Sequence, residues 1–374
     1  MHKAVISGTG LFTPPYSISN EELVMSFNRY VEEYNHLNSD MIKSNKLEAL
    51  LPSSAEFIEK ASGIKSRYVM NKEPILDTNI MHPLGLERKI NEDSVQSDMS
   101  CAAAKEALNM AKINARDIDA VICACSNMPR AYPALAIEIQ NRLGIESCFS
   151  FDLNVACASA AFALNLASAY ITNNTVKNIL IVNPEICSAH LNFRDRDSHF
   201  IFGDACTAMV VQSKDIVTSD NSYTILDSRL KTQYSENIHN NHGFLSLTNL
   251  DNKPRAEKYF VQEGRKVFKE IIPLISNFLL NHINDNALET SDVKRLWIHQ
   301  ANINMNNLIA KKVLGFEPTS MQAPITLDKF ANTSSAGSII AFHKHNLDLE
   351  SGDKGIISAF GGGYSAGSII LEKN

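Results

Sequence analysis

The sequence predicts an α/β fold built from two similar halves. Apolar stretches of strand length alternate with segments of helical periodicity along most of the 374 residues. This alternation is typical of a largely parallel or mixed sheet covered by helices. In addition, a set of short motifs recurs in the same order in the second half of the chain. The length exceeds what one ordinary core supports, so two domains or one large duplicated domain are expected.

The repeat is visible in three pairs of segments. Residues 296–302 (LWIHQAN) resemble 121–127 (VICACSN), residues 313–316 resemble 142–145, and residues 330–337 (FANTSSAG) resemble 155–162 (VACASAAF). The offsets agree, since 302 − 127 and 332 − 157 both equal 175 and 315 − 144 equals 171. We interpret this as an internal duplication, with halves at 1–215 and 216–374. Cys157 and Asn332 would then occupy equivalent strand-to-helix junctions facing a shared cleft.

The individual elements are predicted from periodicity and from capping and turn residues. Residues 28–93 are polar and rich in proline, and we expect an excursion with short helices there, anchored in the core by residues 57–58 and 63–64. The remaining predictions are strands at 3–8, 119–126, 178–183, 208–212 and 367–371, a helix start at 19–23, helices at 97–113 and 133–143, and a strand that runs into a helix within 149–170.

Composition excludes several classes of protein. A net charge of −6 with scattered lysines and arginines argues against nucleic-acid binding, which needs a dense basic face. No apolar run reaches the length of a membrane span, and the first residues read as a strand and a glycine turn instead of a secretion signal. We therefore expect a cytoplasmic protein. Seven cysteines without a Cys-x-x-Cys pair indicate neither a disulfide framework nor a metal site.

Polar residues stand at matching ends of the duplicated elements. Cys157 lies among small residues at a predicted helix start, where the helix dipole favours the thiolate. His299 follows an apolar strand, Asn332 precedes a helix of small residues, and residues 360–364 (FGGGY) form a glycine loop. Each feature alone has a structural interpretation: a core cysteine, a hydrogen-bonded histidine, an N-cap and a turn. Their coincidence at equivalent positions favours a catalytic site.

Four motifs carry a specific resemblance. NVACASA, WIHQAN, FANTSSAGS and FGGGYSAG, in this order and spacing, resemble the β-ketoacyl-acyl-carrier-protein synthase III family. The resemblance implies the thiolase-like fold, with helices and two sheets in five αβαβα layers, and a homodimer. It also implies a catalytic triad of Cys157, His299 and Asn332.

The resemblance further implies a decarboxylating condensation that initiates fatty-acid biosynthesis. Cys157 would take an acyl group from acyl-CoA, with the amides of Cys157 and Gly362 as the oxyanion hole. Malonyl-acyl-carrier protein would then lose carbon dioxide while neutral His299 and Asn332 donate hydrogen bonds to the developing enolate. This chemistry requires no metal or redox cofactor.

The chain departs from the family at the coenzyme A and carrier-protein contacts. Phe57 and Ala61 replace the aromatic residue, usually tryptophan, and the arginine that hold the adenine, whereas Arg196 matches a second family arginine. Asn304 replaces an arginine that the family uses toward its acidic carrier protein. Lys311 and Lys312 match the carrier-docking helix, although a solvated helix face explains them equally well.

Two aromatic positions bear on the primer. Tyr132 stands where short-primer members carry phenylalanine at the floor of the acyl pocket, contributed across the dimer, and Phe360 is expected to contact substrate. Together with the long excursion, this predicts a primer longer than acetyl, such as a medium-chain acyl thioester in a β-ketodecanoyl-forming enzyme.

Three alternatives remain open. A ketone synthase or an ester- or amide-forming acyltransferase would load Cys157 and use another acceptor. A papain-like hydrolase shares the order Cys, His, Asn, but its cysteine context differs and the duplication would stay unexplained. A non-catalytic scaffold is the third, and the complete set of polar residues argues against it.

Overall fold

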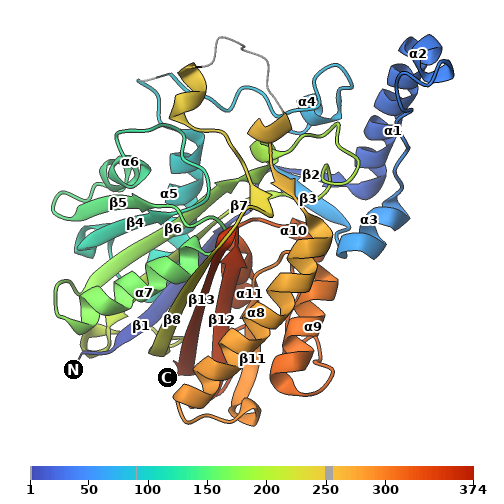
Figure 1. Ribbon diagram of the computed structural model, residues 1–374. Helices are drawn as coiled ribbons and strands as arrows, with labels where there is room; N and C mark the ends of the chain where they lie inside the picture. The colour runs from blue at the N-terminus through green and yellow to red at the C-terminus, as the bar shows by residue number, and fades with distance from the viewer. Residues whose placement is uncertain (1, 90, 249–255) are drawn as a thin grey trace.

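The computed structural model describes residues 2–89, 91–248 and 256–374 (Figure 1). Its centre is one continuous nine-stranded sheet in the order β11-β12-β13-β8-β1-β7-β6-β4-β5. The first half of the chain contributes β1 (Ala4–Phe12), β4 (Ala120–Ala124), β5 (Phe149–Leu153), β6 (Asn178–Ile186) and β7 (Asp204–Ser213). The second half contributes β8 (Tyr223–Ser235), β11 (Val293–Ile298), β12 (Lys354–Gly361) and β13 (Gly363–Lys373).

Strand directions repeat outward from the centre of this sheet. β1 runs antiparallel to β7, β7 antiparallel to β6, and β6 parallel to β4. In the other direction, β8 runs antiparallel to β13, β13 antiparallel to β12, and β12 parallel to β11. The two sets are joined where Val5 and Ile6 pair with Thr224 and Tyr223. The order of strands is mirrored about this short join, which connects the two expected sheets into one. The division of the chain after residue 215 stays a prediction.

Two helices lie between the two sets of strands. α7 (Ser159–Thr172) and α11 (Ala336–Lys344) each contact strands of both halves. The inward residues of α7 are mostly alanine and fully buried. A methyl group added at Gly367 on β13 would lie 2.4 Å from the Ala161 side chain. Small residues therefore let α7 approach the strands closely, as a helix layer covered on both faces requires.

Helices also cover the outer faces, which completes five layers. α5 (Val95–Ala111) and α6 (Leu135–Arg142) pack on β4, β6 and β7 through one apolar cluster. α8 (Gly264–Asp285) and α9 (Ile303–Leu314) pack on β11, β12 and β13 through another. Figure 1 shows α8 and α9 side by side in front of β11 and β12. The predicted αβαβα architecture is confirmed by this arrangement.

The excursion differs in part from its prediction. α1 (Asn20–Leu37) begins with the expected capping box at Ser19 but continues for 18 residues, so the expectation of short helices alone from residue 28 was wrong. Leu23, Phe27 and Val31, four residues apart, bury one face of this helix and explain its length. The predicted anchors are confirmed, since Ile58 and Ile64 are fully buried.

The remaining elements are short. They are the strand pairs β2 (Tyr16–Ser19) with β3 (Ser66–Val69) and β9 (Ile238–His239) with β10 (Val261–Gln262), and the helices α2 (Ser39–Lys43), α3 (Ala55–Ser62), α4 (Glu73–Leu76) and α10 (Leu327–Phe330). α1 and α2 project from one corner of the molecule, at the upper right of Figure 1. Along the described ranges, no helix has the length and apolarity needed to cross a bilayer.

Candidate active site

One cavity of about 590 Å³ brings together residues from both halves of the chain. Cys157, His299 and Asn332 all line it. Phe57, Phe360 and Gly362, which the sequence also singled out, belong to the same wall, and the excursion closes one side through residues 57–64. Tyr132, Arg196, Lys311 and Lys312 are not among the lining residues.

Cys157 lies at a tight turn between β5 and α7. Ala156, immediately before it, has a φ of 48°, in the left-handed region that alanine rarely adopts. Ser159 fixes this turn, because its hydroxyl accepts a hydrogen bond from the Val155 amide at 2.8 Å and donates one to the Ala156 carbonyl at 2.7 Å. Ala331, immediately before Asn332, has a φ of 55°. A positive φ thus recurs at the offset of 175 residues (331 − 156).

The thiol is less acidic than the sequence suggested. Burial raises the pKa of Cys157 to about 12, and the nearby Glu185 carboxylate contributes in the same direction. The Ser334 hydroxyl, which donates to Cys157 Sγ at 3.4 Å, works against this shift but does not cancel it. The expectation of a thiolate stabilised by the helix start is therefore wrong, because desolvation of the Cys157 thiol outweighs the effect of the favourable end of α7.

His299 follows β11 and is held as a neutral imidazole. Its amide donates to the Ser358 carbonyl at 2.7 Å, and its ring packs edge-to-face on Phe360 with centroids 5.3 Å apart. Burial lowers the pKa of His299 to about 4. Nδ1 is buried and has no hydrogen-bond partner within the part of the chain that the structure describes. The ring is therefore uncharged at neutral pH, as the predicted role requires.

Asn332 is tied to the first half of the chain. Its amide donates to the Ile201 carbonyl at 3.0 Å, and its own carbonyl accepts from the Gly203 amide at 3.1 Å. The side-chain oxygen accepts the Ser334 amide at 2.9 Å. This bond uses Oδ1, and Nδ2 is the donor group of the same side chain.

The glycine loop approaches Cys157 through Gly361. A methyl group at Gly361 would lie 2.7 Å from Cys157 Cβ and 3.1 Å from Sγ. A methyl group at Gly362 would instead meet Ile238 and Ala156 at 3.6 Å or more. The sequence had selected Gly362 alone, whereas Gly361 is the glycine required for this close approach.

Phe57 and Arg196 lie against each other at one side of the cavity. The Arg196 guanidinium sits 4.3 Å from the centre of the Phe57 ring, and its Nε donates to the Pro52 carbonyl at 2.8 Å. Phe57 also packs edge-to-face on Phe200. An aromatic ring and an arginine are thus paired in a direct cation–π contact, with no space between them.

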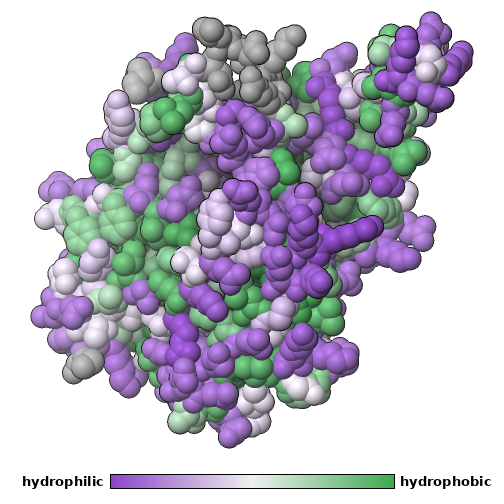
Figure 2. Space-filling model, in the orientation of Figure 1, coloured by the Kyte–Doolittle hydropathy of each residue, from purple (hydrophilic) through white to green (hydrophobic). Residues whose placement is uncertain are grey.

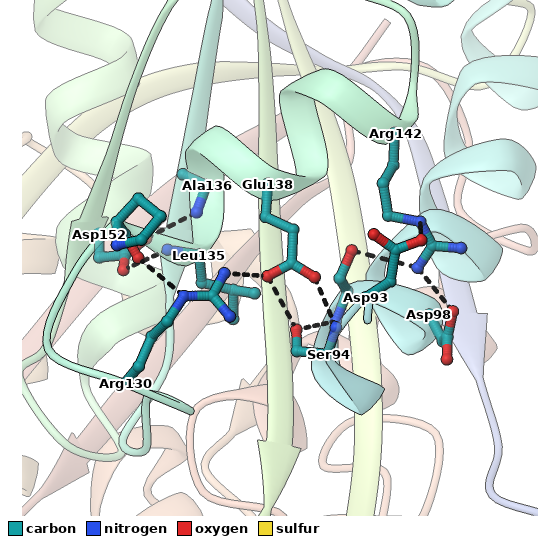
Figure 3. Close-up of polar contacts among 11 residues, drawn as sticks. Asp93, Ser94, Asp98, Arg130, Leu135, Ala136, Glu138, Arg142 and Asp152 are labelled. Carbon is teal, nitrogen blue, oxygen red and sulfur yellow. Dashed lines mark hydrogen bonds and ion pairs between the residues drawn. The ribbon is translucent and has the colours of Figure 1, made fainter. Parts of the chain in front are cut away.

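Tyr132 stands 84% exposed on the loop between β4 and α6. Figure 3 shows how this loop is held at both sides. Arg130 forms an ion pair with Glu138 of α6. The Asp152 carboxylate, on β5, accepts the Leu135 and Ala136 amides at 2.7 and 2.8 Å and so caps α6. An ion pair and two hydrogen bonds thus hold the loop, and the Tyr132 ring extends from it into solvent.

Lys311 and Lys312 lie on the exposed face of α9, in its last turn. Lys311 forms an ion pair with Glu317. Asn304, at the other end of α9, donates to the Lys60 carbonyl of α3 at 3.4 Å. The lysines are thus solvent-accessible, and α9 connects them to Met305 and Asn302 at the cavity.

Sequence reasoning missed three groups at the site. Ser334 lies within the FANTSSAGS motif and contacts Cys157, yet serine in a small-residue run gave no reason to select it. Arg265, at the start of α8, and Ile238 line the cavity from segments without a recognisable motif.

Within the described ranges no cluster of three or more histidine, cysteine or acidic side chains could hold a metal, and all seven cysteines are unpaired.

Comparison with known proteins bears on the fold and on the family. Residues 151–233 match the family model of 3-oxoacyl-[acyl-carrier-protein] synthase III, and residues 283–373 match its C-terminal counterpart. A crystal structure of 3-oxoacyl-[acyl-carrier-protein] synthase III from Aquifex aeolicus superposes with a TM-score of 0.76 at 24% identity, covering 100% of both chains. The beta-ketodecanoyl-[acyl-carrier-protein] synthase of Pseudomonas aeruginosa is 52% identical over 349 residues, which cover 93% of this chain and 99% of that protein.

The five layers define a protein of the thiolase-like fold. More narrowly, the chain belongs to the β-ketoacyl-acyl-carrier-protein synthase III family. It is an acyltransferase of the condensing type, which forms β-ketoacyl-acyl-carrier protein at the start of fatty-acid synthesis.

Proposed function

We propose that Cys157, His299 and Asn332 catalyse this condensation on a primer longer than acetyl. The observation that carries the assignment is that the three side chains, from two halves of the chain, line one cavity. The 52% identity to a protein named as a β-ketodecanoyl synthase supports a medium-chain primer. The proposed chemistry uses thiol, thioester and carboxylate groups and needs no metal or redox cofactor.

In the first step Cys157 Sγ attacks the carbonyl carbon of an acyl thioester. A new carbon–sulfur bond forms to Cys157, the bond to the donor sulfur breaks, and the thiol proton passes to the leaving thiolate. The charge on the carbonyl oxygen is transient and needs N–H donors. The amides of Cys157 and Gly362 are proposed for this role, supported by their common position on the cavity wall. His299 is proposed to stay uncharged in this step, since burial lowers its pKa to about 4.

In the second step malonyl-acyl-carrier protein loses carbon dioxide. The electron pair of the broken carbon–carbon bond moves onto the thioester oxygen, and the enolate carbon then attacks the carbonyl carbon of acyl-Cys157. A new carbon–carbon bond forms, the bond to Cys157 Sγ breaks, and Sγ leaves as a thiolate that takes up a proton from solvent. The His299 N–H and the Asn332 Nδ2 are proposed as the two uncharged donors to that oxygen. Neutral donors stabilise the enolate without holding a negative charge of their own. Occupation of Asn332 Oδ1 by the Ser334 amide supports this orientation.

Phe57 and Arg196 are proposed to contact the nucleotide of an acyl-CoA donor, and Phe360 to contact the acyl or malonyl group beside His299. The stacking of Arg196 on Phe57 means that a base can enter between them only if the pair separates. Arg265 lines the same cavity and adds a positive charge there. Lys311 and Lys312 are proposed to attract the acidic carrier protein, with Lys311 first released from Glu317.

A homodimer is proposed from the outer edge of the sheet. β5 pairs with β4 alone among the described strands. Phe149 at this edge is 38% exposed, and Ile137 on α6 is 47% exposed. Figure 2 shows an apolar area at the left, over β5, α6 and α7. Pairing of two such edges would cover this area and let Tyr132 of the partner subunit reach the acyl site. A cytoplasmic location is proposed as well, because acyl-CoA and acyl-carrier protein are the proposed substrates.

The decisive test is loading of purified protein with radiolabelled acyl-CoA of two to twelve carbons, followed by malonyl-acyl-carrier protein. We expect preferential labelling of Cys157 by medium chains, carbon dioxide release and a β-ketoacyl-carrier product. The Cys157→Ala variant should neither label nor condense. Exclusive labelling by acetyl-CoA would refute the longer primer. A product other than a β-ketoacyl-carrier thioester would favour the related ketone or ester synthases.

A further inference from the structure

Glu185 is a fully buried carboxylate near the end of β6. One oxygen accepts the Ser126 amide at 2.9 Å, the Ser335 amide at 3.1 Å and the Ser335 hydroxyl at 2.5 Å. The other accepts the Ser126 hydroxyl at 2.6 Å and the Asn127 side-chain amide at 2.8 Å. Burial raises the pKa of Glu185, and these hydrogen bonds oppose the rise. A buried carboxylate with this many donors is a built feature of the fold.

These partners come from both halves of the chain. Ser126 and Asn127 follow β4 in the first half, and Ser335 follows the Asn332 loop in the second. Along that loop the contacts reach the proposed catalytic groups directly. The Ser334 hydroxyl donates to Cys157 Sγ, and the Ser334 amide donates to Asn332 Oδ1. Glu185 therefore binds Ser335, the neighbour of the Ser334 residue that makes both of these contacts. Glu185 itself does not line the cavity.

We propose that Glu185 is a positioning residue that ties the loop carrying Asn332 to the half of the chain carrying Cys157. This proposal rests on the proposed function of Asn332, and it adds to the proposed catalytic residues one that lies outside the cavity. A carboxylate suits the role because every group that faces it is a donor. A glutamine would turn an N–H₂ group toward at least one of those donors and leave it unpaired.

The prediction concerns turnover more than substrate binding. Asn332 is proposed to act on charge that develops only during decarboxylation, so a displaced Asn332 should lower kcat with little change in KM. For Glu185→Gln we expect kcat of condensation to fall by about tenfold or more, with KM for malonyl-acyl-carrier protein within about twofold of the parent. Ser335→Ala should lower kcat in the same way but less, because it removes one of the two Ser335 bonds.

The double variant tests whether the effect passes through Ser335. If it does, Glu185→Gln combined with Ser335→Ala should be scarcely slower than Glu185→Gln alone, because the two residues act as one unit. Fully additive losses would overturn the proposal. So would a Glu185→Gln protein with unchanged kcat.

A matched control, Asp119, lies at the opposite end of β4 and β6 from Glu185. The Asp119 carboxylate accepts the Lys177 and Asn178 amides at 2.8 and 2.9 Å, before β4 and at the start of β6. Asp119→Asn also weakens a link between these two segments, but far from the cavity. It should leave kcat unchanged, and a loss equal to that of Glu185→Gln would mean that both act through general stability.

Amide hydrogen exchange provides a measurement that needs no substrate. Glu185→Gln should raise exchange of residues 332–337 by about tenfold or more, and Asp119→Asn should not. If the parent enzyme fails to condense malonyl-acyl-carrier protein, the proposed function fails while exchange still decides the role of Glu185. If Glu185→Gln does not fold, Ser335→Ala carries the test, and unchanged exchange together with unchanged kcat in that variant would refute the proposal.

Discussion

Gly361 lies so close to Cys157 that a single added methyl group would come within 3.1 Å of the sulfur. We predict that Gly361→Ala lowers the rate of Cys157 acylation by about 100-fold or more, since an acyl carbon needs that space in the near-attack geometry. Acylation can be followed by intact-protein mass spectrometry. Gly243→Ala is the control, because a methyl group there meets nothing within 4 Å. Normal acylation of Gly361→Ala would mean that the acyl group approaches Sγ from another side.

The raised pKa of Cys157 predicts an unusual alkylation profile. With a pKa of about 12, the thiolate fraction grows about tenfold per pH unit below that value. The rate of Cys157 alkylation by iodoacetamide should therefore climb without a plateau between about pH 7 and pH 10. Peptide-resolved mass spectrometry separates it from the half-buried Cys148. A plateau near neutral pH would instead mean that Cys157 is a thiolate at that pH, as its position at a helix start suggested.

Buried neutral histidines predict acid sensitivity of the fold. Burial lowers the pKa of both His299 and His199 to about 4. The unfolded chain binds protons near its ordinary value of about 6.5, so stability is complete above that pH and falls as the pH drops toward 4. Each histidine contributes roughly 3 kcal/mol to this loss. Urea unfolding at several pH values measures it. His199→Phe, which keeps the stack on Phe27, should flatten the pH dependence; an unchanged slope would exclude His199 as a contributor.

Asp152 caps α6 from a neighbouring strand (Figure 3). Asp152→Ala leaves two amides at the helix start without acceptors and should lower the free energy of unfolding by about 2 kcal/mol. Asp152→Asn should cost less, because its side-chain oxygen still accepts one amide. Chemical denaturation compares the two variants. Equal stability of Asp152→Ala and the parent would show that water replaces the carboxylate at no cost.

The sequence predicted the fold because its evidence was periodic and repeated. The offset of 175 residues marked Cys157 and Asn332 as equivalent, and both follow an alanine with a positive φ. α1 extends past its predicted region because Phe27 and Val31, four residues apart, face the core. The polar residues between and after them hide this helical spacing in the sequence. Gly361 could not be separated from Gly362 by sequence, since only the backbone path decides which glycine meets Cys157.

The thiol pKa could not be predicted for a different reason. The helix start at Cys157 is a local feature that the sequence reveals, but the desolvation that outweighs it comes from residues far along the chain. Glu185 and Ser334 likewise reach the site only through the fold. The pKa of a buried group therefore depends on neighbours that only the three-dimensional structure reveals, even where the sequence already identifies the reacting groups.

The positive φ of Ala156 and of Ala331 turns the chain just before Cys157 in one half and just before Asn332 in the other. Each half thus brings only part of the proposed set of reacting groups to the shared cavity. Neither half would suffice by itself, so the two must stay held together for the condensation to proceed.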